Sequence, residues 1–211
     1  MLSGFYINLS HRTDRKDKFE ELKNNYPLFS QIKRFNAIQN VNGAFGCTMS
    51  HKNALQEIYN NIKQPYYIIC EDDFFIFNKK NYEAFNKKFE EICDLSWNVI
   101  TLTPRGDTLK EYTQFQDKDF FRVVNNQTMT AYIIKREFVP ILIDELEKGI
   151  QNMMDGKGVE TNTCDQIWKN LQHNNIFLYY KNIFAGQLPG YSDIEKRQVN
   201  YNKRFVTQNR Y

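Results

Sequence analysis

Short apolar runs alternate along the chain with longer segments whose apolar residues recur at helical spacing. Within 14–25, Phe19 and Leu22 stand among charged residues, which predicts an amphipathic helix, and 81–95 has the same kind of pattern. A long helix is expected after Gly46 and a shorter one from Thr163 or Cys164, while 120–150 predicts two strands and then a long amphipathic helix. Further strands are predicted at 5–9, 31–38, 66–70, 97–102 and 176–180.

The run "YYIIC" at 66–70 is apolar at nearly every position, a pattern typical of a strand that is covered on both faces of an α/β sheet. Strands and helices alternate throughout. We therefore expect a single α/β, Rossmann-like domain over 1–211, with a mainly parallel central sheet flanked by helices. The polar segment 186–211, which contains Pro189 and Gly190, is expected to be loop-rich.

Charge and composition exclude some classes of partner. The 211 residues carry a net charge of +3 without a basic tract, so nucleic-acid binding is not expected. The first residues are too polar for a signal peptide, and no apolar run approaches the roughly 20 residues of a membrane span, which favours a cytoplasmic protein. The four cysteines lie far apart and favour reduced thiols, with two disulfides as the alternative.

Three consecutive acids, Glu71, Asp72 and Asp73, follow the strand at 66–70. Ligands in open α/β sheets bind at the carboxyl ends of strands. Glu71 and Asp73 would share a side of an extended segment, where a hard cation such as Mg²⁺ or Mn²⁺ would neutralise them and leave positions for a diphosphate. The alternative is a solvated acidic turn.

"NLSHRTDR" at 8–15 is a second candidate place. Arg12 and Arg15 offer bidentate donors to phosphate, and the backbone near Asn8 could meet a planar base. Alternatively, Asp14 is simply the N-cap of the following helix.

"GCTMSH" at 46–51 is the third candidate place for a functional site. Ser50 and His51 are predicted in the first turns of a helix, whose amide dipole favours anionic groups. A lone histidine is, however, more often structural.

These motifs, taken as an ordered set, resemble glycosyltransferase family 25, the family of the bacterial lipooligosaccharide galactosyltransferases and the procollagen galactosyltransferases. The resemblance covers residues 5 to about 196, in the segments "FYINLSHRTDRKDKFEEL", "GAFGCTMSHKNAL", "YYIICEDDFFI", "TAYIIKREF", "CDQIWKNL" and "GQLPGYSDIEK".

The resemblance implies a GT-A glycosyltransferase fold and transfer of a hexose from a UDP-sugar, with Mn²⁺ or Mg²⁺ as cofactor. Galactose and glucose are the hexoses expected before others. Carried over, Asp73 and Glu71 are the metal ligands. The residues expected to bind the nucleotide-sugar are Asn8, Arg12, Arg15, Ser50, His51, Glu71, Asp72 and Gln187.

Asp165, in "TCDQIW", matches an acidic position late in the family pattern and is our candidate base for an inverting transfer to a glycan, lipooligosaccharide or hydroxylysine-type acceptor. The alternative is an acid that only interacts with its helix dipole. Two other functions remain open: a catalytically silent sugar-binding module, and a metal-dependent phosphodiesterase or nucleotidyltransferase. Trp97 and Trp168 fit core positions better than sugar-stacking ones.

Overall fold

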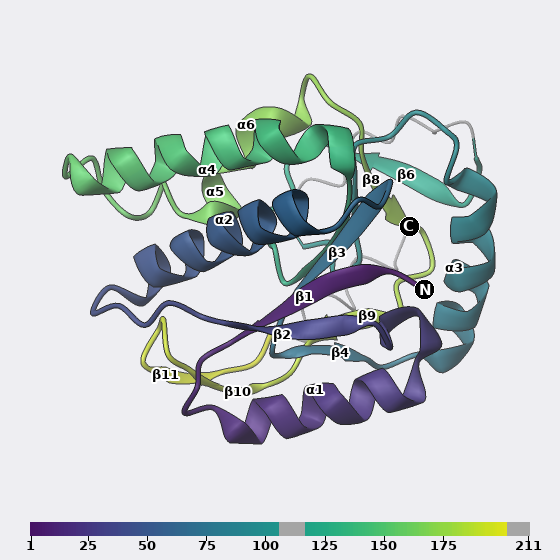
Figure 1. Ribbon diagram of the computed structural model, residues 1–211, viewed down its shortest axis with the longest axis horizontal. Coiled ribbons are helices and arrows are strands. Elements are labelled where there is room, and N and C mark those ends of the chain that lie inside the picture. The colour runs from purple at the N-terminus through teal and green to yellow at the C-terminus, as the bar shows by residue number, and fades with distance from the viewer. Residues whose placement is uncertain (106–116, 202–211) are drawn as a thin grey trace.

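The computed structural model describes residues 1–105 and 117–201, and its centre is a seven-stranded sheet with strand order β2-β1-β3-β7-β5-β8-β6 (Figure 1). Apolar side chains fill these strands, and the runs predicted from the sequence appear within one or two residues of their expected bounds. The strands are β1 (Ser3–Asn8), β2 (Ile32–Asn36), β3 (Tyr66–Glu71), β5 (Val99–Thr101), β6 (Phe120–Val123), β7 (Ala131–Lys135) and β8 (Phe177–Tyr180).

Most strands of the sheet run in the same direction. β1 is parallel to β2 and to β3, and β5 is parallel to β8. Among the described strands of this sheet, only β7, between β3 and β5, and the edge strand β6 run the opposite way. The predicted mainly parallel α/β sheet is therefore confirmed, and the carboxyl ends of β1 and β3 lie side by side because Ile7 is in register with Glu71.

Helices cover both faces of the sheet. One core contains α1 (Thr13–Asn25), the 3-10 helix η1 (Pro27–Phe29) and α3 (Lys79–Ile92). The other face is covered by α2 (Gly43–Asn61), α4 (Val139–Met154), α5 (Cys164–Ile167) and α6 (Lys169–Gln172), with the 3-10 helix η2 (Arg136–Phe138) leading into α4. Figure 1 shows α2 and α4 side by side on this second face.

Both tryptophans belong to the core, as predicted. The Trp97 indole donates to the Ile92 carbonyl at 2.8 Å, and the Trp168 indole donates to the Asn126 carbonyl at 2.9 Å. Because both rings are buried and their N–H groups are satisfied, neither is a sugar-stacking surface.

Helix α2 begins earlier than predicted, at Gly43. The Asn42 side chain accepts hydrogen bonds from the amides of Ala44 and Phe45 and so caps the helix. Gly46, which we expected to precede the helix, lies inside it where a Cβ would approach the Ile38 carbonyl to 2.6 Å. The glycine thus permits close packing.

The segment after residue 185, predicted as loop, instead contains short strands. β9 (Ala185–Gln187) pairs with β4 (Phe74–Ile76), and β10 (Gly190–Ser192) forms a hairpin with β11 (Arg197–Val199). The helix expected from Thr163 or Cys164 does begin at Cys164, but it is divided into α5 and α6. Residues 202–211, also within the predicted loop, lie outside the described residues.

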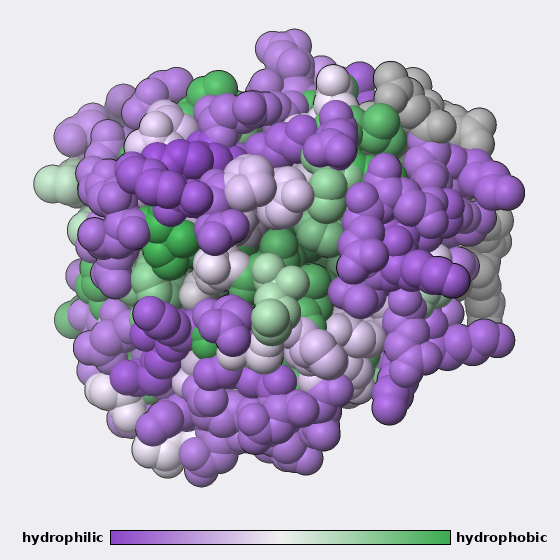
Figure 2. Space-filling model, turned by 45° about the vertical axis from the view of Figure 1, so that its right-hand side comes forward, coloured by the Kyte–Doolittle hydropathy of each residue, from purple (hydrophilic) through white to green (hydrophobic). Residues whose placement is uncertain are grey.

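Figure 2 shows one face of the molecule, on which hydrophilic residues surround a central strip of hydrophobic ones. Over residues 1–105 and 117–201, we find no helix with both the length and the apolar character that crossing a bilayer demands.

The contact between β1 and β3 can be tested at Gly4, where an added Cβ would lie 1.9 Å from the Ile68 carbonyl oxygen. A backbone atom cannot move aside as a flexible side chain can. We expect Gly4→Ala to lower the free energy of unfolding by about 3 kcal/mol, the upper end for overpacked sites, in urea denaturation. Gly190→Ala, where a Cβ meets nothing within 4 Å, is the matched control. Equal stability of the two variants would contradict this packing.

Candidate active site

The three predicted acids lie where β3 ends. Glu71 is the last residue of the strand, and Asp72 and Asp73 form the turn to β4. Arg15, from α1, donates through one nitrogen to Asp72 at 2.8 Å and to Asp73 at 3.2 Å. Its other nitrogen donates to the Tyr191 carbonyl in β10 at 2.8 Å. The acidic turn is therefore held between the first helix and the C-terminal hairpin.

The expectation that Glu71 and Asp73 share one side of an extended segment is wrong, because the backbone turns directly after Glu71. One oxygen of Glu71 lies 3.4 Å from His51 Nε2 and 3.8 Å from Cys47 Sγ. The other accepts from the Thr130 hydroxyl at 3.2 Å. The Glu71 side chain thus contacts α2 and the segment before β7, whereas the two aspartates contact Arg15.

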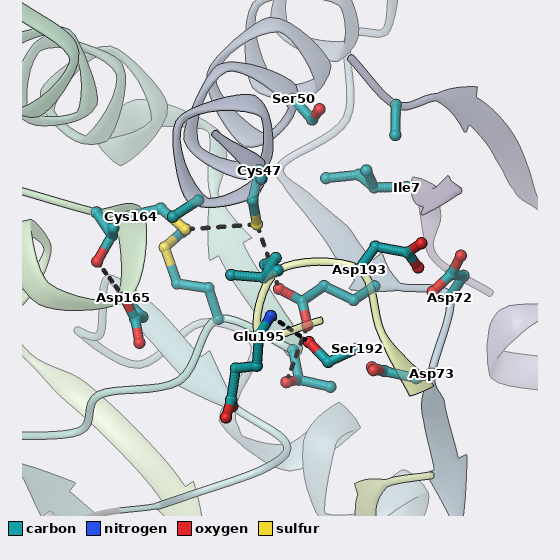
Figure 3. Close-up of a pocket in the computed structure, with 18 of the residues that line it drawn as sticks. Ile7, Cys47, Ser50, Asp72, Asp73, Cys164, Asp165, Ser192, Asp193 and Glu195 are labelled. Carbon is teal, nitrogen blue, oxygen red and sulfur yellow. Dashed lines mark hydrogen bonds between the residues drawn. The ribbon is translucent and has the colours of Figure 1, made fainter. Parts of the chain in front are cut away.

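A cavity of about 470 Å³ lies in front of the acids and is lined by several predicted site residues (Figure 3). Figure 3 shows Asp72 and Asp73 on one side of it and Asp165 on the other. The predicted residues among its lining are Arg15, Ser50, Glu71, Asp72, Asp73, Asp165 and Gln187. Residues from the start and the end of the chain meet here.

Asn8 and Arg12 lie behind the lining. The buried Asn8 amide donates to Asp72 at 2.7 Å, and its oxygen accepts from Arg34 at 2.7 Å. Arg12 contacts Asp14 at 2.9 Å and Asp193 at 2.6 Å. Asn8 therefore orients a site carboxylate, and Arg12 ties the hairpin to α1.

Ser50 and His51 are buried in the interior of α2, not in its first turns, because the helix already begins at Gly43. Ser50 donates to the Gly46 carbonyl at 2.7 Å and accepts from the Ile38 amide at 2.8 Å. The nitrogens of His51 face Tyr132 at 3.3 Å and Glu71 at 3.4 Å. A direct effect of the helix N-terminus on these two side chains is therefore excluded.

Burial dominates the acid–base properties of the turn. Desolvation and the neighbouring charge of Glu71 raise the pKa of Asp73 to about 8. Burial also raises the pKa of Asp72, although Arg15 opposes the shift. For Glu71, burial acts to raise the pKa, but the hydrogen bonds with His51 and Thr130 contribute to a net lowering.

Asp165 is the second residue of helix α5 and accepts a 2.6 Å hydrogen bond from the Thr163 hydroxyl. Burial raises its pKa above the ordinary value. The bond to Thr163 fixes one carboxylate oxygen, so the orientation of the group is defined at the cavity wall.

The residues present fit a hard cation. Among the described residues, Asp73 Oδ1 and Gln187 Oε1 are buried acceptor oxygens without a hydrogen-bond partner, and Gln187 donates to the other Asp73 oxygen at 3.2 Å. Carboxylate and amide oxygens suit Mg²⁺ or Mn²⁺. Of the two predicted ligands, Asp73 has the open oxygen, while both oxygens of Glu71 have protein neighbours.

Sequence reasoning missed several residues that contact the site. Thr130 precedes β7, and only the antiparallel pairing of β3 with β7 brings it to Glu71. Cys47 and Cys164 are free thiols, as predicted, but their sulfur atoms lie 3.8 Å apart although 117 residues separate them. No local pattern signals these proximities.

Comparison with known proteins extends the description of the fold. No family model and no curated protein matches the sequence. A glycosyltransferase involved in the glycosylation of the major capsid of PBCV-1 aligns with a TM-score of 0.57 and 9% identity, over 100% of this chain and 99% of that one. The chain has a glycosyltransferase-like α/β fold. At this identity, the likeness concerns the fold alone.

Two further solved structures are similar. A197 from STIV aligns with a TM-score of 0.50 and 13% identity, over 94% of this chain and 93% of that one. Mannose-1-phosphate geranyltransferase from Thermus thermophilus gives a TM-score of 0.39 and 9% identity, over 83% of this chain and 58% of that one. Membership of glycosyltransferase family 25 stays a prediction.

The raised pKa of Asp73 makes stability depend on pH. Between an unfolded pKa of about 4 and a folded pKa of about 8, the folded protein holds a proton that the unfolded chain releases. The free energy of unfolding therefore falls as the pH rises through this window. Without divalent cations, we expect Asp73→Asn to raise the free energy of unfolding at pH 8 by at least about 1 kcal/mol in urea denaturation.

Asp14→Asn is the control for this measurement. The hydrogen bond from Arg12 lowers the pKa of Asp14 to about 2, so its stabilisation is present above pH 4 or so and is lost as the pH falls through about 2. This variant should gain no stability at pH 8. If Asp73→Asn also gains none, the carboxylate is not destabilised as the structure indicates.

Proposed function

We propose that this chain is a metal-dependent glycosyltransferase that moves a hexose from a UDP-sugar to a hydroxyl acceptor with inversion. The observation that carries the proposal is the buried Asp72–Asp73 turn at the end of β3, with a partnerless oxygen on Asp73 among the described residues. It borders a cavity whose other side holds a carboxylate, that of Asp165. The likeness in fold to a solved glycosyltransferase supports this proposal.

At the donor end, Asp73 would hold Mn²⁺ or Mg²⁺, with Gln187 beside it and Glu71 as the neighbouring carboxylate. When bound, the cation stabilises the negative charge of the departing nucleoside diphosphate. Arg15 lines the cavity and supplies a permanent positive charge for phosphate oxygens. Asp72 shares Arg15 and is oriented by Asn8, which leaves it placed for ribose or sugar hydroxyls.

The remaining predicted contacts are part of the same proposal. Ser50 lines the cavity directly, whereas His51 acts on it through Glu71. Arg12 would act at the nucleotide end through its contact with Asp193, a cavity residue of the hairpin. The nucleotide would thus bind between α1, α2 and the hairpin.

At the acceptor end, Asp165 would take the proton from the attacking hydroxyl. An inverting transfer needs this base on the side of the sugar opposite the leaving group, and Asp165 lies across the cavity from the two aspartates. Its raised pKa makes the carboxylate a stronger proton acceptor than an ordinary aspartate. Thr163 keeps one oxygen in place.

The donor class proposed here is the one that the resemblance to glycosyltransferase family 25 implies. A volume of about 470 Å³ lies within the usual range of roughly 300–1,000 Å³ for ligand sites. We propose UDP-galactose or UDP-glucose as donor. A glycan, lipooligosaccharide or hydroxylysine-type protein hydroxyl would be the acceptor.

The first test is a thermal-shift screen of UDP and UDP-sugars with and without Mn²⁺, followed by detection of transferred sugar. A ligand that binds only the folded state raises its melting temperature, so we expect a Mn²⁺-dependent shift that Asp73→Asn abolishes. No shift with any nucleotide would favour the silent sugar-binding module. Cleavage of the donor without transfer to any acceptor would favour a phosphodiesterase.

Asp165→Asn tests the role of the base separately. Because the amide cannot accept the proton, we expect kcat to fall by about 10²–10⁴-fold, while the Kd for UDP with Mn²⁺ changes little. Asp144→Asn, on the surface of α4, is the control and should keep the wild-type kcat. Loss of UDP binding in Asp165→Asn would place this residue at the donor end instead.

A further inference from the structure

Two thiols, an imidazole and a carboxylate converge beside the cavity. Cys47 and His51 lie one turn apart in α2, Cys164 begins α5, and Glu71 ends β3. The ligand atoms of Cys47, His51 and Cys164 all lie within 4.8 Å of one another. His51 and Cys164 are buried, and Cys47 is partly buried.

We propose that Cys47, His51, Cys164 and Glu71 form a zinc site. Zinc is usually bound by four ligands in a tetrahedral arrangement of thiolate, imidazole and carboxylate groups. Its binding would release the two thiol protons to solvent, because zinc binds the thiolate form.

Three distances between these donor atoms agree closely with the edges of such a tetrahedron. With Zn–S bonds of about 2.3 Å and Zn–N and Zn–O bonds of about 2.1 Å, two sulfurs lie about 3.8 Å apart, sulfur and oxygen about 3.6 Å, and nitrogen and oxygen about 3.4 Å. The corresponding separations are 3.8 Å for Cys47–Cys164, 3.8 Å for Cys47–Glu71 and 3.4 Å for His51–Glu71. The ligand atoms of His51 lie within 4.8 Å of both sulfurs as well, so the four side chains surround one common position.

The neighbouring groups are placed to orient these ligands. Tyr132 Oη lies 3.3 Å from His51 Nδ1, so a proton on Nδ1 would bond to the tyrosine and leave Nε2 for the metal. Thr130 donates to the Glu71 oxygen that faces away from the cluster. Hydrogen bonds of this kind fix ring orientation and carboxylate position in zinc sites.

The donor atoms separate this site from the one at Asp73. Thiolate and imidazole select zinc, whereas the carboxylate and amide oxygens of Asp73 and Gln187 suit Mg²⁺ or Mn²⁺. Since all four zinc positions are taken by protein side chains, the site is structural rather than catalytic. It would fasten α2, β3 and α5 together at the wall of the cavity. The inference does not depend on the proposed transfer reaction.

The first experiment measures metal in the wild-type protein. We expect about one equivalent of zinc by elemental analysis of protein purified without added metal or chelator. After zinc is removed, Co²⁺ should bind with an intense thiolate-to-metal absorption in the near ultraviolet and the visible bands of tetrahedral cobalt. Zinc should then displace the cobalt and abolish both signals.

Variants assign the ligands. Cys47→Ser and Cys164→Ser should lower zinc affinity by more than the roughly 10–100-fold that loss of a supporting hydrogen bond costs, and should weaken the thiolate absorption. Cys93→Ser is the matched control, because this partly buried thiol lies at the end of α3, outside the cluster. Asp73→Asn should also keep the cobalt spectrum, which separates the two sites.

The wild-type titration decides the matter even if a cysteine variant fails to fold. Absence of both zinc and the thiolate–cobalt absorption in folded wild-type protein would overturn the proposal. So would full retention of the cobalt spectrum in folded Cys47→Ser and Cys164→Ser. A Cys47–Cys164 disulfide in the purified protein, seen by mass spectrometry before reduction, would also overturn it, in favour of a redox pair.

Discussion

The site depends on one cation, the Arg15 guanidinium, which keeps two buried carboxylates beside each other. Adjacent carboxylates in a site of low polarity repel each other and lose water, and both effects oppose their ionisation. Arg15 is permanently charged and bonds to Asp72 and Asp73 through one nitrogen. With Glu71 next to the turn, this single positive charge faces three acids. In the proposed function, a divalent cation bound at this turn would favour the ionised form of these acids.

Elements from other parts of the chain hold the acids in this arrangement. The parallel pairing of β1 with β3 aligns their carboxyl ends, so Asn8 reaches Asp72 and is itself fixed by Arg34. Helix α1 follows β1 closely and presents Arg15 to the turn. The antiparallel β7 brings Thr130 to Glu71 from the other side. Each of the three acids therefore has a different set of hydrogen-bond partners.

The sequence predicts the sheet well because apolar runs and helical spacing are local signals. It also identifies the acids at the end of 66–70, since the change from apolar to acidic residues marks where the strand ends. The start of α2 differs from the prediction because Gly43 and Gly46 suggest a loop, although Asn42 caps a helix that already begins at Gly43. The strands β9, β10 and β11 are three residues long, too short for alternation to reveal them. The contact between Cys47 and Cys164 arises from the tertiary structure, and no local sequence pattern predicts it.

The contact between Arg15 and the carbonyl of Tyr191 spans 176 residues of chain, and Arg12 reaches Asp193 across a similar interval. During synthesis, Arg12 and Arg15 leave the ribosome long before the hairpin does. The hairpin then supplies their remaining hydrogen-bond partners. The sheet around β1, β2 and β3 can form first, because its contacts are closer in sequence. Until the hairpin docks, Arg15 lacks its hydrogen bond to the Tyr191 carbonyl. The acidic turn and the hairpin residues that line the same cavity thus come together only in a late step of folding.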